Sequence, residues 1–416
     1  MSGPFPGHVV VVGASLAGLR AVTTARENGY TGRITLVGEE PHLPYDRPPL
    51  SKEYLADGPL TTAHHLPDAD TLVDDLDIDV RTGTRATGIA PDEHVLTLLD
   101  GEIHYDAALI ATGVRPRTLP GSDHLAGVHT LRSLDDAALI RAGLDAGART
   151  VVIGAGFIGA EVASAARHRG LPATILEMQN APLVRAVGST AGTALAALHS
   201  RNGTDLRCGV TVEALLGEGR VEAVRLGDGT EIAADLVVVG IGADPATEWL
   251  RSSGLALDNG VICDSTLHAG HDVWAAGDVA NWTNRLFDRR MRLEHWTNAG
   301  EQAAHAMVNL LDPVGATEYR HVPYFWSDWY GRRIQFAGLP TGEPTLVSGS
   351  WDDDTFVALF RSADRLAGVL TLDRRGDIMK YRALIGRRAT WQAALDLAAS
   401  RNAQTAPAAA GAATTA

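Results

Sequence analysis

The stretch Val9-Val-Val-Val-Gly13-Ala-Ser15-Leu-Ala-Gly18 decides the fold, because it joins a β-branched run to a glycine turn and an apolar-periodic segment. Such runs favour strands, and apolar residues spaced by three and four favour helices. A similar stretch, Val151-Val-Ile-Gly154-Ala-Gly156-Phe-Ile-Gly159, follows 141 residues later, counted from Gly13 to Gly154. The segments Ile34–Val37 and Thr174–Leu176 read as second strands. The sequence therefore predicts strand, turn, helix and strand twice.

A second pair of landmarks extends this duplication. The segments Tyr105–Gly113 and Ala234–Gly242 each carry an acidic residue, an apolar strand and a glycine turn, and they run on to Pro116 and Pro245. Each segment also follows an Asp-Gly hairpin signal. Because both landmarks recur in the same order, we expect whole modules to be duplicated.

The two glycine loops indicate dinucleotide binding. A G-x-G-x-x-G loop between a strand and a helix brings backbone N–H groups and the positive helix end to a pyrophosphate. The second loop is complete, and Glu177 ends the next strand, where an acid accepts ribose hydroxyls. In the first loop Ser15 replaces the middle glycine, and Glu39 ends the strand. One such loop can be a plain tight turn, but two with matching strands and acids predict two nucleotides.

The residue types around these loops indicate which nucleotides bind. A carboxylate at Glu177 would repel a 2′-phosphate, which favours NADH over NADPH. The segment Trp274–Ala280 reads as an apolar strand that leads into Gly277-Asp278 and then a helix. That pattern would place a carboxylate beside a ribityl chain, although Asp278 could equally be an ordinary helix cap. Together with the duplication it predicts a flavoprotein.

Composition excludes several functions. The 416 residues contain 36 Lys and Arg against 50 Asp and Glu, a formal net charge of −14, which argues against nucleic-acid or anionic-membrane binding. The only cysteines, Cys208 and Cys263, form no C-x-x-C pair, which excludes a disulfide framework and a thiolate metal cluster. The histidines, including His64, His65 and His295, have no metal-ligand spacing and read as satisfied or solvent-facing. Without a leader or a spanning segment, we expect a cytoplasmic protein.

On these residues the chain resembles the two-dinucleotide-binding flavoprotein family, in its NADH-dependent ferredoxin reductase branch, from about Val9 to Arg388. The most specific element is Pro44-Tyr-Asp-Arg47-Pro48-Pro49-Leu-Ser51-Lys52, supported by Trp274–Ala280, Glu294–Ala299 and Tyr324–Asp328. The branch serves bacterial Rieske-type dioxygenases and cytochrome P450 systems. Trp329 departs from the pattern, since relatives usually have a polar residue there.

The resemblance implies an α/β protein with two Rossmann-like domains, for FAD and NAD, and a C-terminal α+β domain with an antiparallel sheet. We expect the FAD domain at 1–113 and 244–316, the NADH domain at 114–243, the C-terminal domain at 317–400 and a disordered tail at 401–416. Alternation in 322–337 and 356–372 agrees with that sheet, capped by a helix after Ile378.

The same resemblance implies the cofactor contacts residue by residue. Those for FAD are Gly13, Ser15, Ala17, Gly18, Glu39, Arg47, Pro49, Lys52, Ala86, Thr112, Arg132, Asp278 and Trp296. Those for NADH are Gly154, Gly156, Ile158, Gly159, Glu177, Arg185 and Gly242. No metal site is expected.

Lys52 stands out because only it and Lys380 are lysine, whereas the other 34 basic residues are arginine. An ammonium is a compact point charge, which suits one donor beside flavin N5. The resemblance pairs Lys52 with Glu161, and we hypothesise that the pair stabilises charge as hydride reaches N5. The alternative is a solvated lysine at a helix start.

The electron acceptor follows from what the sequence lacks. Without a C-x₄-C dithiol beside the flavin, electrons must leave from the flavin edge, which suits a transient [2Fe–2S] ferredoxin that feeds a P450 or Rieske oxygenase. Trp296, Trp326 and Trp329 are candidate edge aromatics, with a core position favoured for Trp329. Alternatives are a rubredoxin or quinone reductase, or an NADH-binding redox sensor resembling apoptosis-inducing factors. The protein can be a monomer or a homodimer.

The charge is unevenly distributed. Residues 1–284 have a net charge of −16, and residues 285–416 have +2. A local basic patch could therefore steer an acidic partner, although a solvated arginine-rich surface is an equal alternative. The candidate patch residues are Arg285, Arg289, Arg290, Arg292, Arg332 and Arg333.

Overall fold

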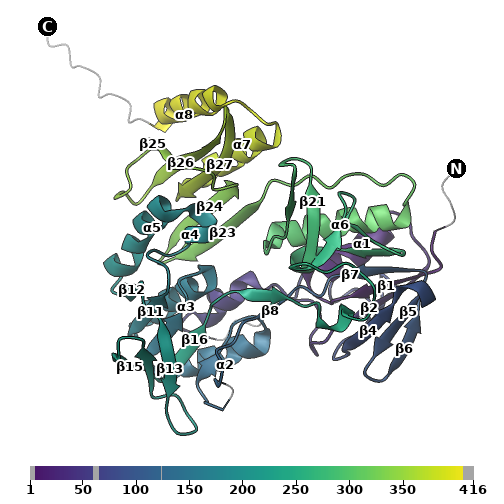
Figure 1. The fold of residues 1–416 in the computed structure, drawn as a ribbon, viewed down its shortest axis with the longest axis horizontal. Helices are drawn as coiled ribbons and strands as arrows, with labels where there is room; N and C mark the ends of the chain where they lie inside the picture. The colour runs from purple at the N-terminus through teal and green to yellow at the C-terminus, as the bar shows by residue number, and fades with distance from the viewer. Residues whose placement is uncertain (1–4, 60–64, 123, 406–416) are drawn as a thin grey trace.

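The structure is a computed structural model that describes residues 5–59, 65–122 and 124–405 (Figure 1). The first glycine stretch lies at the centre of a six-stranded sheet, in the order β19-β20-β7-β1-β2-β3. Its central strand β1 (His8–Val12) runs parallel to both neighbours, and Val9–Val12 are at most 3% exposed because both faces are covered. The other strands are β2 (Arg33–Val37), β3 (Asp79–Arg81), β7 (Ala107–Ile110), β19 (His268–Gly270) and β20 (Val273–Ala275).

The second glycine stretch forms a matching parallel sheet in the order β12-β11-β10-β16-β9. In each copy the loop leads into a helix, α1 (Leu16–Glu27) in the first and α3 (Phe157–His168) in the second. The predicted strand–turn–helix–strand duplication is confirmed. The strands are β9 (Val128–His129), β10 (Thr150–Ile153), β11 (Ala173–Glu177), β12 (Asp205–Cys208) and β16 (Leu236–Val239), with helices α2 (Leu134–Asp145), α4 (Val184–Val187) and α5 (Ser189–Arg201).

Each parallel sheet carries an antiparallel three-stranded insertion. The expected Asp-Gly turns, at Asp100-Gly101 and Asp228-Gly229, lie in these insertions between their second and third strands. The strands are β4 (Ala86–Ala90), β5 (Val95–Leu98) and β6 (Gly101–His104) in the first, and β13 (Val212–Leu216), β14 (Ala223–Leu226) and β15 (Glu231–Ala233) in the second. The duplicated proline segments, β8 (Val114–Pro116) and β17 (Ala243–Pro245), pair antiparallel with each other. The chain therefore enters and leaves the second unit at one place.

The C-terminal part forms the predicted antiparallel sheet, in the order β23-β24-β27-β26-β25. It is drawn in green and yellow in Figure 1, with both C-terminal helices beside it. The elements are β23 (Tyr324–Trp329), β24 (Arg332–Gly338), β25 (Thr345–Ser348), β26 (Phe356–Ser362), β27 (Arg365–Leu372), α7 (Arg375–Gly386) and α8 (Trp391–Thr405).

The tail predicted from residue 401 begins too early. Residues 401–405 are the last turn of α8. Two contacts hold this turn against the domain: Arg401 Nε donates to Asp377 Oδ1 at 2.5 Å, and Asn402 Nδ2 donates to the Val347 carbonyl at 2.6 Å. The predicted tail at 406–416 lies outside the described residues.

The helix predicted after Gly277-Asp278 is also wrong. A single 3₁₀ turn, η5 (Gly277–Val279), leads directly into β21 (Ala280–Asn284), which pairs with β18 (Val261–Cys263) and β22 (Arg289–Met291). Gly277 has a φ of +77°, outside the right-handed helical region, and the backbone that follows pairs with β18 and β22 in a sheet. The nearby helix is instead α6 (Trp296–Leu311), which packs on α1. The remaining 3₁₀ turns are η1 (Pro48–Ser51), η2 (Glu53–Leu55), η3 (Pro91–Glu93) and η4 (Glu248–Leu250).

The first and second glycines of the second loop, Gly154 and Gly156, have different roles, and alanine substitutions can separate them. Gly154 has a φ of +102°, and a Cβ there would lie 2.4 Å from the Gly240 carbonyl oxygen. We expect Gly154→Ala to lower the free energy of unfolding by about 2 kcal/mol. At Gly156 the nearest atom to a Cβ is 3.8 Å away, so Gly156→Ala should change the free energy of unfolding by less than about 1 kcal/mol. Urea unfolding of both variants tests this, and equal losses would contradict it.

His199 makes stability depend on pH. It is fully buried on α5, its Nδ1 lies 2.7 Å from Tyr330 Oη, and burial lowers its pKa to about 4. Below pH 6.5 the unfolded chain takes up a proton that folded His199 does not, so the free energy of unfolding falls as the pH falls. We expect this loss to reach about 2 kcal/mol at pH 5. Measured by urea unfolding, the free energy of unfolding of His199→Gln should fall less between pH 7 and pH 5 than that of the unmodified protein. An equal fall would exclude His199 as the cause.

Candidate functional site

Two adjoining cavities of about 310 Å³ each lie beside the first glycine loop. Cavity 1 extends from this loop to α3, α6 and β23, and cavity 2 extends along the ends of β1 and β2. The five residues that line both cavities are Ser15, Ala111, Arg47, Gly113 and Arg132. The cavities therefore form one elongated site.

The first glycine loop closes tightly against β7 and tolerates its serine. Gly13 has a φ of +121°, and a Cβ there would lie 2.1 Å from the Ala111 carbonyl oxygen, so only glycine fits. Ser15 has a φ of −123°, which any residue adopts, and its Oγ accepts a hydrogen bond from Arg47 Nε at 3.2 Å. The replaced glycine therefore adds a group that holds a cation at the N-terminus of α1.

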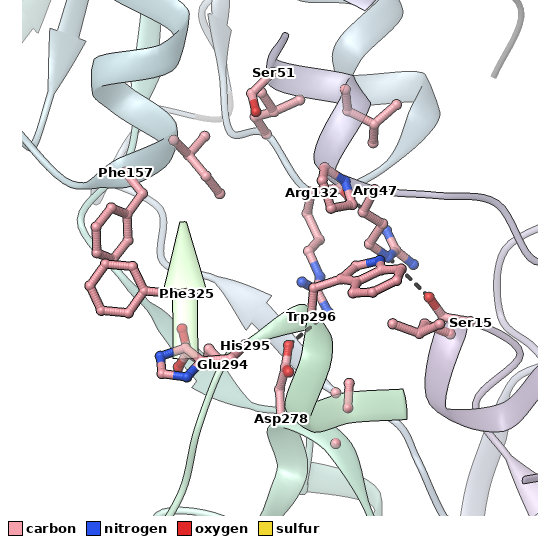
Figure 2. A pocket seen from close by; sticks show the side chains of 18 of the residues that line it. Ser15, Arg47, Ser51, Arg132, Phe157, Asp278, Glu294, His295, Trp296 and Phe325 are labelled. Carbon is pink, nitrogen blue, oxygen red and sulfur yellow. Dashed lines mark hydrogen bonds and ion pairs between the residues drawn. The ribbon is translucent and has the colours of Figure 1, made fainter. Parts of the chain in front are cut away.

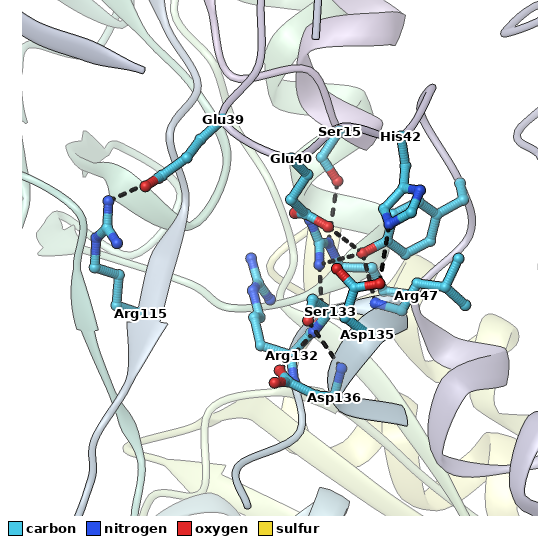
Figure 3. Close-up of polar contacts among 12 residues, drawn as sticks. Ser15, Glu39, Glu40, His42, Arg47, Arg115, Arg132, Ser133, Asp135 and Asp136 are labelled. Atoms are coloured by element: carbon cyan, nitrogen blue, oxygen red, sulfur yellow. Dashed lines mark hydrogen bonds and ion pairs between the residues drawn. The ribbon is translucent and has the colours of Figure 1, made fainter. Parts of the chain in front are cut away.

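Arg47 is fixed by a partly buried polar cluster that the sequence did not predict (Figure 3). It pairs with Glu40 at 2.5 Å and donates to the Arg132 carbonyl at 2.5 Å, while Tyr45 Oη donates to Glu40. Burial alone would raise the pKa of Glu40, but the Arg47 guanidinium and the Tyr45 hydroxyl hold it below its usual range. The cluster thereby positions the Arg47 guanidinium between the two cavities.

The predicted carboxylate Glu39 lies at the far side of cavity 2. It follows β2 and pairs with Arg115 at 2.8 Å and with Arg85 at 3.6 Å. Figure 3 shows the Glu39–Arg115 pair apart from the cluster around Arg47. Gly13, Ala86 and Thr112 line the same cavity, as predicted for cofactor contacts.

The polar wall of cavity 1 contains Asp278 and Trp296 (Figure 2). Asp278 pairs with Arg132 at 3.3 Å, and Trp296 Nε1 donates to Asp46 Oδ1 at 2.7 Å. Ala17 also lines this cavity. Two of the residues predicted to contact FAD line neither cavity: Gly18 packs against the loop, where a Cβ would lie 1.9 Å from the Gly13 carbonyl oxygen, and Pro49 lies inside η1.

Lys52 and Glu161 are paired, as hypothesised. Lys52 Nζ lies 2.8 Å from Glu161 Oε2, and the two side chains are 16% and 4% exposed. Two serines that sequence reasoning missed, Ser51 and Ser327, each donate to the same carboxylate at 2.5 Å. Ser51 stands directly before Lys52 in the sequence, but Ser327 is distant in sequence and its partner follows only from the fold.

The second glycine loop reaches cavity 1 through its helix. Ile158 and Phe157 line the cavity, and Phe157 packs on Phe325 with ring centroids 4.5 Å apart. Glu177 is held at the loop, where it accepts hydrogen bonds from the backbone N–H groups of Ala155 and Gln179, both at 2.8 Å.

The remaining residues predicted to contact NADH lie outside the two cavities. The loop glycines Gly154, Gly156 and Gly159 lie beside the strand end that carries Glu177. Arg185 is exposed on α4, and Gly242 is exposed beside β17.

The three candidate tryptophans lie where they were expected, Trp329 in the core and Trp296 and Trp326 at cavity 1. Trp329 is fully buried, which confirms the core position, whereas Trp326 lines cavity 1 edge-on to Trp296 at 6.0 Å. His295 was misjudged: its Nδ1 is buried without a hydrogen-bond partner among the described residues, and burial lowers its pKa to about 3.

The predicted basic patch carries little free charge. Arg285, Arg292, Arg332 and Arg333 have carboxylate partners, at 3.7 Å from Glu318, 2.8 Å from Glu294, 3.1 Å from Asp373 and 2.7 Å from Asp328, respectively. Most of the positive charge is therefore neutralised locally, which weakens the steering hypothesis.

Two properties of the described residues concern metal binding and membrane insertion. Among them, no group of three His, Cys, Asp or Glu side chains is arranged to hold a metal ion. No helix within 5–59, 65–122 and 124–405 is long and apolar enough to cross a membrane.

Comparison with known proteins matches almost the whole chain. A family model described as pyridine nucleotide-disulphide oxidoreductase matches residues 7–303, and one described as reductase C-terminal matches residues 324–404. Rhodocoxin reductase of Rhodococcus erythropolis is 37% identical over 91% of this chain and 89% of its own length. The ferredoxin reductase component of chlorobenzene dioxygenase from Cupriavidus sp. (strain PS12) is 39% identical over 92% and 93%. The solved covalent putidaredoxin reductase–putidaredoxin complex matches with a TM-score of 0.86 and 32% identity, over 95% and 98%.

Proposed function

The chain belongs to the pyridine nucleotide-disulphide oxidoreductase family, and from this premise we propose that it is an FAD-dependent NADH:ferredoxin reductase. The observation that carries the proposal is the Lys52–Glu161 pair on the wall of a cavity that both dinucleotide loops approach. The relatives described above are named as reductases of rhodocoxin and as a ferredoxin reductase component of a dioxygenase.

The elongated site fits FAD. Cavity 1 has apolar walls, including Leu50, Leu131 and Phe325, which suit a flat aromatic ring system. The junction of the two cavities offers Arg47, Arg132 and the N-terminus of α1, which suit a diphosphate. Cavity 2 ends at the carboxylate Glu39, which suits ribose hydroxyls.

When bound, FAD accepts a hydride from NADH and passes the two electrons singly to a one-electron acceptor. The chain positions these partners. Glu177, held by two backbone N–H groups, would accept the ribose hydroxyls of NADH. Ile158 and Phe157, at the start of α3, would direct the nicotinamide toward cavity 1. Lys52 would hold a positive charge at the wall of that cavity, with Glu161 as its counter-ion.

The acceptor follows from the lining of the site. Cys208 and Cys263 line neither cavity, so the described residues offer no dithiol to receive electrons there. We propose that electrons leave at the edge marked by Trp296 and Trp326 to a [2Fe–2S] ferredoxin, which would supply a P450 or a Rieske-type oxygenase.

Purified protein tests this function directly. We expect it to contain FAD that NADH bleaches, and to reduce cytochrome c rapidly only after a [2Fe–2S] ferredoxin is added. Equal activity with rubredoxin or a quinone would favour the alternative reductases. A long-lived, air-stable charge-transfer complex with NADH, accompanied by dimerisation, would favour a redox sensor.

The role of Lys52 can be tested against the only other lysine. We expect Lys52→Met to slow the bleaching of bound FAD by NADH at least about tenfold in anaerobic stopped flow, because it removes the charge at the cavity wall. Lys380 is exposed on α7, so Lys380→Met should react at the rate of the unmodified protein. Equal rates for both variants would exclude the proposed role.

A further inference from the structure

The Glu161 carboxylate accepts four hydrogen bonds. Its Oε2 accepts from Ser51 Oγ at 2.5 Å and from Lys52 Nζ at 2.8 Å. Its Oε1 accepts from Ser327 Oγ at 2.5 Å and from the Asp328 backbone N–H at 3.2 Å. Each oxygen of the carboxylate therefore faces two donors, which fixes its position between the three segments.

The direction of the Ser327 hydroxyl is set by a residue behind it. Trp329 Nε1 lies 2.8 Å from Ser327 Oγ, and an indole N–H can only donate. Ser327 must therefore accept from Trp329, which leaves its single proton for Glu161. Ser327 and Trp329 alternate on β23, so both point to the same face of the strand. Both are fully buried and line neither cavity.

We propose that Ser327 and Trp329 are positioning residues for the Lys52–Glu161 pair. The Trp329 indole fixes the Ser327 hydroxyl, the hydroxyl holds the Glu161 carboxylate in place, and the carboxylate holds the Lys52 ammonium at the wall of cavity 1. This inference rests on the proposed function for its consequence, the rate of hydride transfer, but the chain of contacts is independent of the acceptor.

Asp328, which lies beside this series of contacts, has a charged partner of its own. The Asp328 carboxylate pairs with Arg333 at 2.7 Å, so only its backbone N–H faces Glu161. Among the described residues, Lys52 makes one further hydrogen bond, to the Pro48 carbonyl at 3.2 Å. Glu161 is therefore the acidic side chain that contacts Lys52, and the lysine would report a change in its position.

The two lysines of the sequence make that report measurable. In holoenzyme labelled with ¹³Cε-lysine, the variant Lys380→Arg retains a single lysine resonance, that of Lys52. We expect the position of this resonance at pH 7 to depend on the contact between the Lys52 ammonium and Glu161. Ser327→Ala removes one donor that orients the carboxylate, so the resonance should shift from its position in Lys380→Arg alone. Trp329→Phe, which keeps an aromatic ring, should move it the same way but less.

The same variants should also slow the bleaching of FAD by NADH, but by less than Lys52→Met does. Ser164→Ala is the matched control, because the Ser164 hydroxyl lies on α3 and accepts from the Tyr330 N–H at 2.7 Å, at the same helix–strand interface. It should leave both the Lys52 resonance and the bleaching rate unchanged. A purely structural role for Ser327 would lower the melting temperature without moving either.

An unchanged Lys52 resonance in Ser327→Ala overturns the proposal, and an unchanged resonance in Trp329→Phe alone removes Trp329 from it. Failure of the proposed function has a different signature: the unmodified protein would bind no FAD or would show no bleaching by NADH. In that case the Lys52 resonance of the apoprotein still tests whether Ser327 holds Glu161.

Discussion

The arrangement of the site depends on one buried negative charge. Glu161 is 4% exposed, and a buried charge without partners costs about 3–5 kcal/mol. Its donors come from the 3₁₀ turn around Ser51 and Lys52 and from β23, while Glu161 itself lies on α3. Three segments that are far apart in the sequence must therefore converge on one carboxylate. This constraint ties the first glycine unit, the second and the C-terminal sheet to one cavity.

Much of this fold could be predicted, because duplicated local patterns fix it. Each glycine loop is dictated by close backbone contact, as at Gly13 against the Ala111 carbonyl, and each loop follows a continuous apolar run, Val9–Val12 or Val151–Ile153. The Lys52–Glu161 pair was also predictable, but only through the family resemblance. The pairing of β8 with β17 was not predicted, although the proline segments that form it were identified as a repeat.

The failures share a cause: the sequence does not show what lies opposite a side chain. The helix expected after Asp278 was argued from its preceding strand, but the backbone there is taken by pairing with β18. The steering role of the arginine patch, one of two alternatives, took no account of partners such as Asp328, which faces Arg333 directly across the turn between β23 and β24. Ser327 lies in a segment that supports the resemblance, but its contact with Glu161 follows only from the fold.

Helix α3 explains why nucleotide binding and the charged pair are geometrically linked. Its first turn follows the loop that would hold the NADH pyrophosphate, and Ile158 on that turn lines cavity 1. Glu161 lies three residues later, on the same face of the helix. A rigid helix therefore fixes the distance between the nucleotide loop and the counter-ion of Lys52. Because the C-terminal strand β23 holds that same carboxylate through Ser327, the third unit of the fold helps to set the position of the cation at the cavity where the hydride would be transferred.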